Sequence, residues 1–231
     1  MKYSIEEKNL KESIIINILT FILTLAGCII MFTGFKFMYG TGPALETTKF
    51  GVFKFFTVDS NVFMGIIALV FAIQEIKLKK GKIKEIKPIY YILKLIATTG
   101  VTLTFFVVFT YLGPISENGI YSMLLNSNLF FHLVIPVLSL FNFIIYERTT
   151  QTPFKYTFSG LLPSLLYAVF YLINILIHMK NGVVSMEYDW YCFVQNGVWT
   201  AIIVMPIMLI ITYGISLALW KLNKRVEMPK Q

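Results

Sequence analysis

Residues 13–35 read SIIINILTFILTLAGCIIMFTGF, a run of 23 residues without a charged side chain. A helix of about 20 apolar residues crosses a hydrocarbon layer of roughly 30 Å. An open strand in lipid would leave its backbone N–H and C=O groups unpaired, whereas a helix pairs them internally. This stretch therefore predicts a transmembrane helix near the start of the chain.

Five further runs of similar length follow. The third is expected to end at Gly113-Pro114. Hydrophobic residues make up 57% of the 231 residues and charged residues 14%, whereas soluble domains are about 25% charged. We therefore predict one all-α transmembrane domain, residues 1–231, with six transmembrane helices. The five further spans are expected at residues 53–76, 88–112, 124–146, 156–178 and 198–220.

The basic residues predict the orientation of this bundle. Of the 20 Lys and Arg residues, 15 lie on one side of the predicted spans and four on the other, and Lys94 lies within a span. Cytoplasmic connections carry such an excess. We therefore expect a multi-pass protein of the cell membrane with both termini in the cytoplasm. The excess of positive charge attracts anionic lipids. We therefore expect membrane lipids as partners and no nucleic acid, while the oligomeric state is left open.

The two cysteines, Cys28 and Cys192, form neither a disulfide framework nor a zinc-ligand pattern. We expect no metal and no cofactor. The residues before and including Cys28, LAGC, resemble a lipoprotein cleavage box. The apolar run continues beyond Cys28, however, which favours a first helix that is retained.

Polar side chains inside spans are costly and therefore informative. In the second span Thr57, Ser60 and Asn61 share one helix face, and Asp59 points away from that face. In the fourth span Asn128 and His132 are one helical turn apart.

Both of these helices enter the membrane from the outer side, so Thr57 and His132 are expected at similar depth. A hydroxyl group and an imidazole at matched depth are the minimum for a nucleophile and its general base. Pro136 cannot donate to the carbonyl of His132 and is expected to kink the helix there.

Structural roles are also open for each of these residues. The Thr57 hydroxyl could bond to a carbonyl one turn earlier, and His132 could be a packed core residue. Ser60, Asn61 and Asn128 could serve only as contacts between helices. We expect His178 at the interface and Glu147 with Arg148 as a solvated pair at the cytoplasmic surface.

Two segments resemble a known family. Residues 55–61, FFTVDSN, resemble the start of a helix in bacterial relatives of the androgen-induced transmembrane threonine hydrolases. Residues 131–136, FHLVIP, resemble the histidine helix of that family, in which a proline follows four residues after the histidine. Animal members hydrolyse fatty acid esters of hydroxy fatty acids with a threonine and a histidine. The resemblance implies a bundle of six helices, with Thr57 as nucleophile and His132 as base.

The first hypothesis for the function is therefore a membrane hydrolase of lipid esters. Asn61 or Asn128 would donate to the oxyanion, and Ser60 is a further candidate for contact with the substrate. The second hypothesis is a non-enzymatic membrane protein, either a small-solute transporter or a lipid-binding component. Against transport, no predicted span carries a clear ion-coupling acid besides Asp59, and no internal inverted repeat is visible. An acyltransferase that uses Cys28 or Cys192 is a third, weaker alternative.

The orientation is tested by labelling of single cysteines. Because the positive-inside rule assigns the connection 77–87 to the cytoplasm, Lys82→Cys should react with an impermeant thiol reagent only from the inside. Glu117→Cys should react only from the outside. Labelling of Lys82→Cys from the outside would invert the topology.

Overall fold

The computed structural model describes residues 7–40, 49–116, 118–149, 152–194 and 198–224. Within these ranges the chain forms helices and no β-strand. Glu117 and the two termini, whose side of the membrane is predicted above, lie outside the described residues. The elements in chain order are α1 (Glu7–Thr33), η1 (Lys49–Lys54), α2 (Phe56–Lys79), α3 (Pro88–Val107), η2 (Val108–Leu112), α4 (Gly113–Ile115), α5 (Gly119–Ser122), α6 (Ser127–Leu129), η3 (Phe130–Val134), α7 (Ile135–Ile145), η4 (Phe154–Leu161), α8 (Leu162–His178) and α9 (Val198–Asn223).

Six helical segments of the described chain are long and apolar enough to cross a membrane, which confirms the predicted all-α membrane bundle. Several short elements join into single spans, because α3, η2 and α4 run on without a break, as do α6, η3 and α7. The six segments are Asn9–Thr33, Phe56–Lys79, Pro88–Ile115, Ser127–Ile145, Phe154–His178 and Ile202–Asn223.

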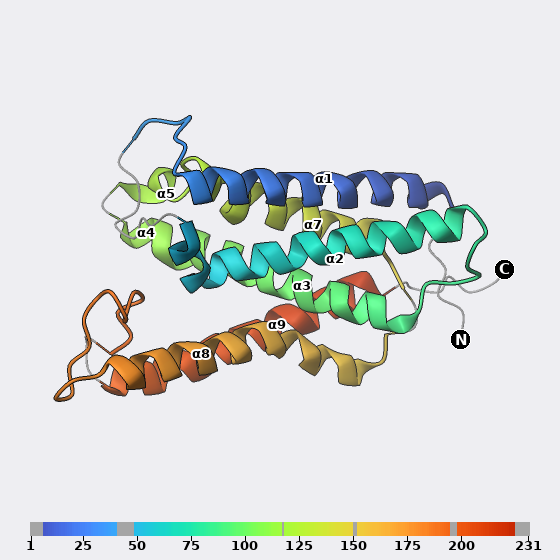
Figure 1. Ribbon diagram of the computed structural model, residues 1–231. Helices are drawn as coiled ribbons and strands as arrows, with labels where there is room; N and C mark the ends of the chain where they lie inside the picture. The colour runs from blue at the N-terminus through green and yellow to red at the C-terminus, as the bar shows by residue number, and fades with distance from the viewer. Residues whose placement is uncertain (1–6, 41–48, 117, 150–151, 195–197, 225–231) are drawn as a thin grey trace.

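Four of the spans form a closed group, and the other two pack on its side. The helix α1 lies beside α2 and α7, and α3 lies beside α2 and α7 (Figure 1). The pair α8 and α9 packs mainly against α3. We call the end of the bundle where α1 begins and α2 ends the basic end, because the lysine-rich connection 80–87 lies there. The opposite end, with the described residues 34–40, 49–55, 113–116, 118–126 and 179–194, is called the far end.

Large apolar side chains cover the outside of the bundle. Ile29 of α1 is 63% exposed, Leu166 of α8 is 67% exposed and Ile210 of α9 is 71% exposed. Exposure of such a large apolar surface to water is unfavourable, whereas contact with lipid chains is not. The outer surface therefore agrees with a multi-pass membrane protein.

The third span is longer than predicted. Its helix continues through Gly113-Pro114 to Ile115, so the prediction that these residues end it at Leu112 is wrong. One turn of π-helix, η2, precedes them, and the N–H of Gly113 bonds to the carbonyl of Val108, five residues earlier. A proline in the first turn of a helical segment needs no N–H partner of its own. A Cβ at position 113 would lie 2.2 Å from the Ile120 side chain, so glycine lets α5 pack here.

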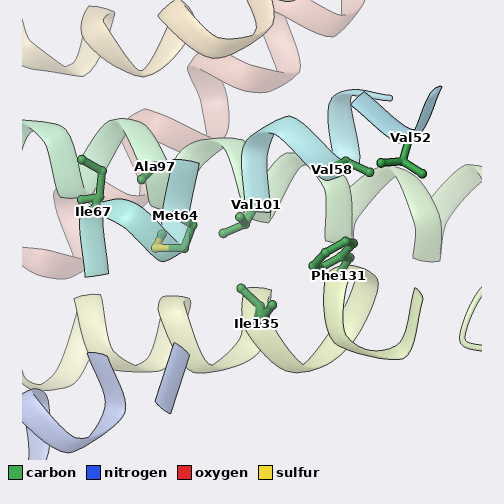
Figure 2. Packing of buried hydrophobic residues seen from close by; sticks show 8 residues of the cluster. All are labelled: Val52, Val58, Met64, Ile67, Ala97, Val101, Phe131 and Ile135. Carbon is green, nitrogen blue, oxygen red and sulfur yellow. The ribbon is translucent and has the colours of Figure 1, made fainter. Parts of the chain in front are cut away.

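The apolar core of the far half lies where α2, α3 and the span of α7 meet. Phe131 and Ile135 face Val58, Met64 and Val101 across this junction (Figure 2). Phe131 has no exposed surface, and a Cβ on Gly27 of α1 would lie 2.6 Å from its ring. The core thus fixes the start of α2 against the helix that carries His132.

Candidate functional site

Asn61 ties the first turns of α2 to the histidine helix. Its Nδ2 donates to the carbonyl of Thr57 at 2.7 Å and to the carbonyl of Phe131 at 3.1 Å. The side chain is fully buried. Thr57 and the residue that precedes His132 are therefore linked through a single amide group.

The carbonyl of Phe131 is open because of Pro136. Residues 130–134 form a π-turn, in which the N–H of Ile135 bonds to the carbonyl of Phe130, five residues earlier. In this register the next N–H would belong to position 136, where proline has none. The π-turn thus leaves the carbonyl of Phe131 without a backbone donor, and Asn61 fills this gap. The expectation that Pro136 also frees the carbonyl of His132 stays a prediction.

His132 is held in one tautomer by a backbone group. Its Nδ1 lies 2.5 Å from the carbonyl oxygen of Met123, and the ring is 8% exposed. A carbonyl oxygen only accepts, so Nδ1 carries the hydrogen and Nε2 keeps its lone pair. No partner of Nε2 is found among the described residues. A base oriented in this way accepts its proton at Nε2.

Thr57 is half-buried in the first turn of α2. Its hydroxyl makes no hydrogen bond within the described part of the chain, so the inert bond to a carbonyl one turn earlier does not form there. Thr57 lies on the helix face between Ser60, which contacts α3, and Asn61, which contacts η3. Nor does any hydrogen bond between described residues join Thr57 to His132, and their pairing as nucleophile and base stays a prediction.

The other predicted site residues have different surroundings. Ser60 is buried, and its Oγ lies 3.1 Å from the Thr57 carbonyl and 3.2 Å from Thr104 Oγ1. The amide group of Asn61 already donates to two carbonyls, which leaves its Oδ1 without a described partner. Asn128 is half-buried, and no described residue bonds to its side chain. Of the three, Asn128 is the one with an amide donor that the described residues leave open.

An apolar pocket with a volume of about 240 Å³ lies beside this site. It opens between the last turns of α1 and the start of α2, and Val58 in its wall is the neighbour of Thr57 in sequence. The pocket is lined by Cys28, Ile29, Met31, Phe32, Thr33, Val52, Phe53 and Val58.

Aromatic residues of α8 and of the segment that follows it cap the start of α2 at the far end. The hydroxyl of Tyr191 accepts the N–H of Phe56 at 3.3 Å, and Tyr167 donates to the carbonyl of Lys54 at 2.5 Å. Burial raises the pKa of Tyr191 to about 12, so its phenol stays protonated. Burial and the charge of Asp189 raise the pKa of the Cys192 thiol. A thiol that keeps its proton is a poor nucleophile, which disfavours Cys192 as an acyltransferase residue.

A second polar group, the Glu75 cluster, lies inside the bundle near the basic end. Sequence reasoning missed it. Its members come from α1, α2, α3 and the end of the α7 span, and each is at most 1% exposed. They are Ser13, Asn17, Glu75, Lys94, Asn142 and Glu147.

Glu147 is the centre of this cluster. Its Oε1 accepts from Lys94 Nζ at 2.9 Å, from Asn17 Nδ2 at 2.8 Å and from Asn142 Nδ2 at 2.8 Å. The expectation of a solvated Glu147–Arg148 pair is therefore wrong. The expectation that Asp59 is the one clear candidate for an ion-coupling acid overlooked Glu75 of α2, which has no exposed surface whereas Asp59 is exposed. The signal was present: Glu75 and Lys94 are opposite charges that lie about one to two turns inside neighbouring spans.

Comparison of this chain with protein-family models, with curated proteins and with solved structures finds no match. The function therefore has to be argued from the two polar sites themselves.

The role of Asn61 is tested by removing its amide. Asn61→Leu keeps the approximate volume but leaves the carbonyl of Phe131 unpaired in a buried setting, which costs about 1–3 kcal/mol. Thermal unfolding of the purified protein in detergent should show this loss of stability. Asn128→Leu is the matched control and should change the melting temperature little. Equal melting temperatures for both variants would mean that Asn61 does not hold the two helices together.

Proposed function

We propose that the chain is a membrane hydrolase of lipid esters, with Thr57 as nucleophile and His132 as general base. The observation that carries this proposal is the state of His132. Its Nδ1–H is held by the Met123 carbonyl, and its Nε2 is left as an acceptor. The Thr57 hydroxyl on the neighbouring helix, to which no described residue bonds, and the link through Asn61 support the same assignment.

The Met123 carbonyl takes the place that a carboxylate often has behind a catalytic histidine. It orients the ring and favours the tautomer with a basic Nε2, and no acid is needed for that purpose. A neutral carbonyl stabilises the imidazolium less than a carboxylate does. We therefore expect a slow enzyme.

The proposed reaction has two halves. His132 Nε2 takes the proton of Thr57, whose Oγ1 attacks the ester carbonyl carbon to give a tetrahedral intermediate. The bond to the alcohol oxygen then breaks, and the alcohol leaves with the proton from His132. Water, deprotonated by His132, attacks the acyl-threonine, and the fatty acid departs as Thr57 regains its proton. Asn128, with its open amide, is the candidate oxyanion donor.

The apolar pocket next to Val58 supports a substrate with an acyl chain. Its wall carries no charged side chain, and it lies beside the residue that would be acylated. The lipid would enter sideways from the membrane, since the pocket lies between α1 and the start of α2. The resemblance to androgen-induced transmembrane threonine hydrolases agrees with such a substrate.

We also propose an orientation of the bundle in the cell membrane. The far end, which carries Thr57 and His132, faces the outside of the cell membrane if the lysine-rich connection 80–87 is cytoplasmic. Both termini are then cytoplasmic, and the substrate comes from the outer leaflet.

A non-enzymatic membrane protein, such as a small-solute transporter or a lipid-binding component, is the second candidate. The Glu75 cluster favours it, because ionisable residues within a membrane often mark a pathway for ions or solutes. Thr57→Val separates the two candidates. It keeps the shape of the side chain and removes the nucleophile, which a transporter tolerates and the hydrolase does not.

Substitution of the proposed pair should abolish activity. We expect Thr57→Val and His132→Ala each to lose both labelling by a fluorophosphonate probe and ester hydrolysis, with folding in detergent retained. The double variant should be no less active than either single one, because the two residues act as a unit. Thr110→Val is the matched control, since the Thr110 hydroxyl bonds to the Phe106 carbonyl in a span near the far end. Full activity of Thr57→Val would exclude the mechanism.

The pocket is tested by filling it. Cys28→Trp should displace at least two methylene groups of a bound chain, at about 0.8 kcal/mol each. The KM for long-chain esters should therefore rise roughly tenfold, while that for acetyl esters changes little. Ile22→Trp, at an exposed position of the same helix, is the control. An equal effect on short and long esters would show that this pocket does not hold the acyl chain.

A further inference from the structure

The Glu75 cluster contains more negative than positive charge. Two carboxyl groups, Glu75 and Glu147, face one ammonium group, Lys94. In the described part of the chain, Lys94 is the one cation within ion-pair distance of either carboxyl group. Both glutamates and Lys94 are at most 1% exposed. If both acids were ionised, the cluster would carry one uncompensated negative charge away from water, which is strongly unfavourable.

The hydrogen bonds favour different protonation states for the two acids. Glu147 Oε1 receives three donors, one of them the ammonium group, so its ionised form is stabilised. Glu75 has only neutral hydrogen-bond partners among the described residues: Asn17 Nδ2, at 3.0 Å from its Oε2, and the hydroxyl of Ser13. The Nζ of Lys94 is directed to Glu147 and to Asn17 Oδ1. Glu75 is thus the acid that the cluster leaves without a counter-charge.

One oxygen of each acid receives no hydrogen bond from the described residues. Glu75 Oε1 and Glu147 Oε2 are buried, and the described residues offer neither of them a donor. Tyr91 of α3 is a further titratable group, and it packs edge-on against Phe71, which lies one turn before Glu75 on α2. The other described members of the cluster are neutral: Ser13 and Asn17 on α1, and Asn142 on α7.

We propose that the cluster is a binding site for one proton, and that this proton resides on Glu75. A proton fits better than a metal ion for two reasons. The ammonium group of Lys94 already bonds to Glu147 and to Asn17, and the described residues contain no group of three or more Asp, Glu, His or Cys side chains that could hold a metal. The site joins α1, α2, α3 and the end of the α7 span, so loss or gain of the proton changes the force that holds these helices together. This inference does not depend on the hydrolase proposal.

Charge balance predicts the number of buried protonated carboxyl groups in the purified protein in detergent. Infrared difference spectroscopy between alkaline and neutral pH should detect one buried protonated carboxyl group in the wild type. Glu75→Gln and Glu147→Gln should both detect none, because each leaves one carboxylate opposite Lys94. Lys94→Met should detect two. Asp59→Asn, which changes an exposed acid, is the control and should resemble the wild type.

Thermal unfolding assigns the proton to Glu75. Glutamine copies a neutral acid, so Glu75→Gln should melt within a few degrees of the wild type at neutral pH, whereas Glu147→Gln should melt lower. At alkaline pH the wild type should lose stability and Glu75→Gln should not. These measurements decide the question even if Lys94→Met fails to fold.

Three results would overturn the proposal. One is a wild-type spectrum without a protonated carboxyl group. A second is a greater loss of stability in Glu75→Gln than in Glu147→Gln, which would assign the proton to Glu147. The third is stabilisation of the wild type, and not of Glu75→Gln, by sodium chloride relative to choline chloride, which would identify a sodium site.

Discussion

The Oε1 atom of Glu147 accepts hydrogen bonds from side chains of α1, α3 and α7, and Asn17 extends the same network to Glu75 on α2. At this depth no water can solvate a charge, so each ionised group must find its partners on neighbouring helices. Apolar packing alone discriminates poorly between arrangements of membrane helices, because lipid chains are as apolar as leucine. The four central spans therefore owe their mutual arrangement near the basic end to this carboxylate.

Near the far end, buried polar groups also need partners on neighbouring helices, and here the uncharged amide of Asn61 provides the contact. The backbone defect that Pro136 creates at the carbonyl of Phe131 would be costly in a lipid-facing position, and the amide of Asn61 repairs it. The repair brings the start of α2 against the π-turn that carries His132. The π-turn that carries His132 and the amide that fixes α2 are thus parts of one local arrangement.

Length and hydropathy were sufficient to predict the six spans, because the number of residues that cross a bilayer is set by its thickness. The predicted end of the third span was wrong, because a π-turn before Gly113-Pro114 lets the helix continue through the proline. Such turns have no clear pattern in sequence. The polar face of Thr57, Ser60 and Asn61 could be predicted from helical spacing. The group that orients His132 could not, because it is the backbone carbonyl of Met123. Glu75 and Lys94 are visible as charges within spans, but their partners depend on how the helices pack.

The claim that the Thr57 hydroxyl is a nucleophile is tested most directly by locating the adduct of a fluorophosphonate probe on the wild-type protein. Peptide mass spectrometry after labelling in native membranes identifies the modified residue without any substitution. If Thr57 is the nucleophile, we expect a single phosphonylated residue, Thr57, on the peptide that contains residues 55–61. Labelling at another residue, or no labelling of a folded protein in which a thiol reagent still reaches the pocket at Cys28, would contradict it.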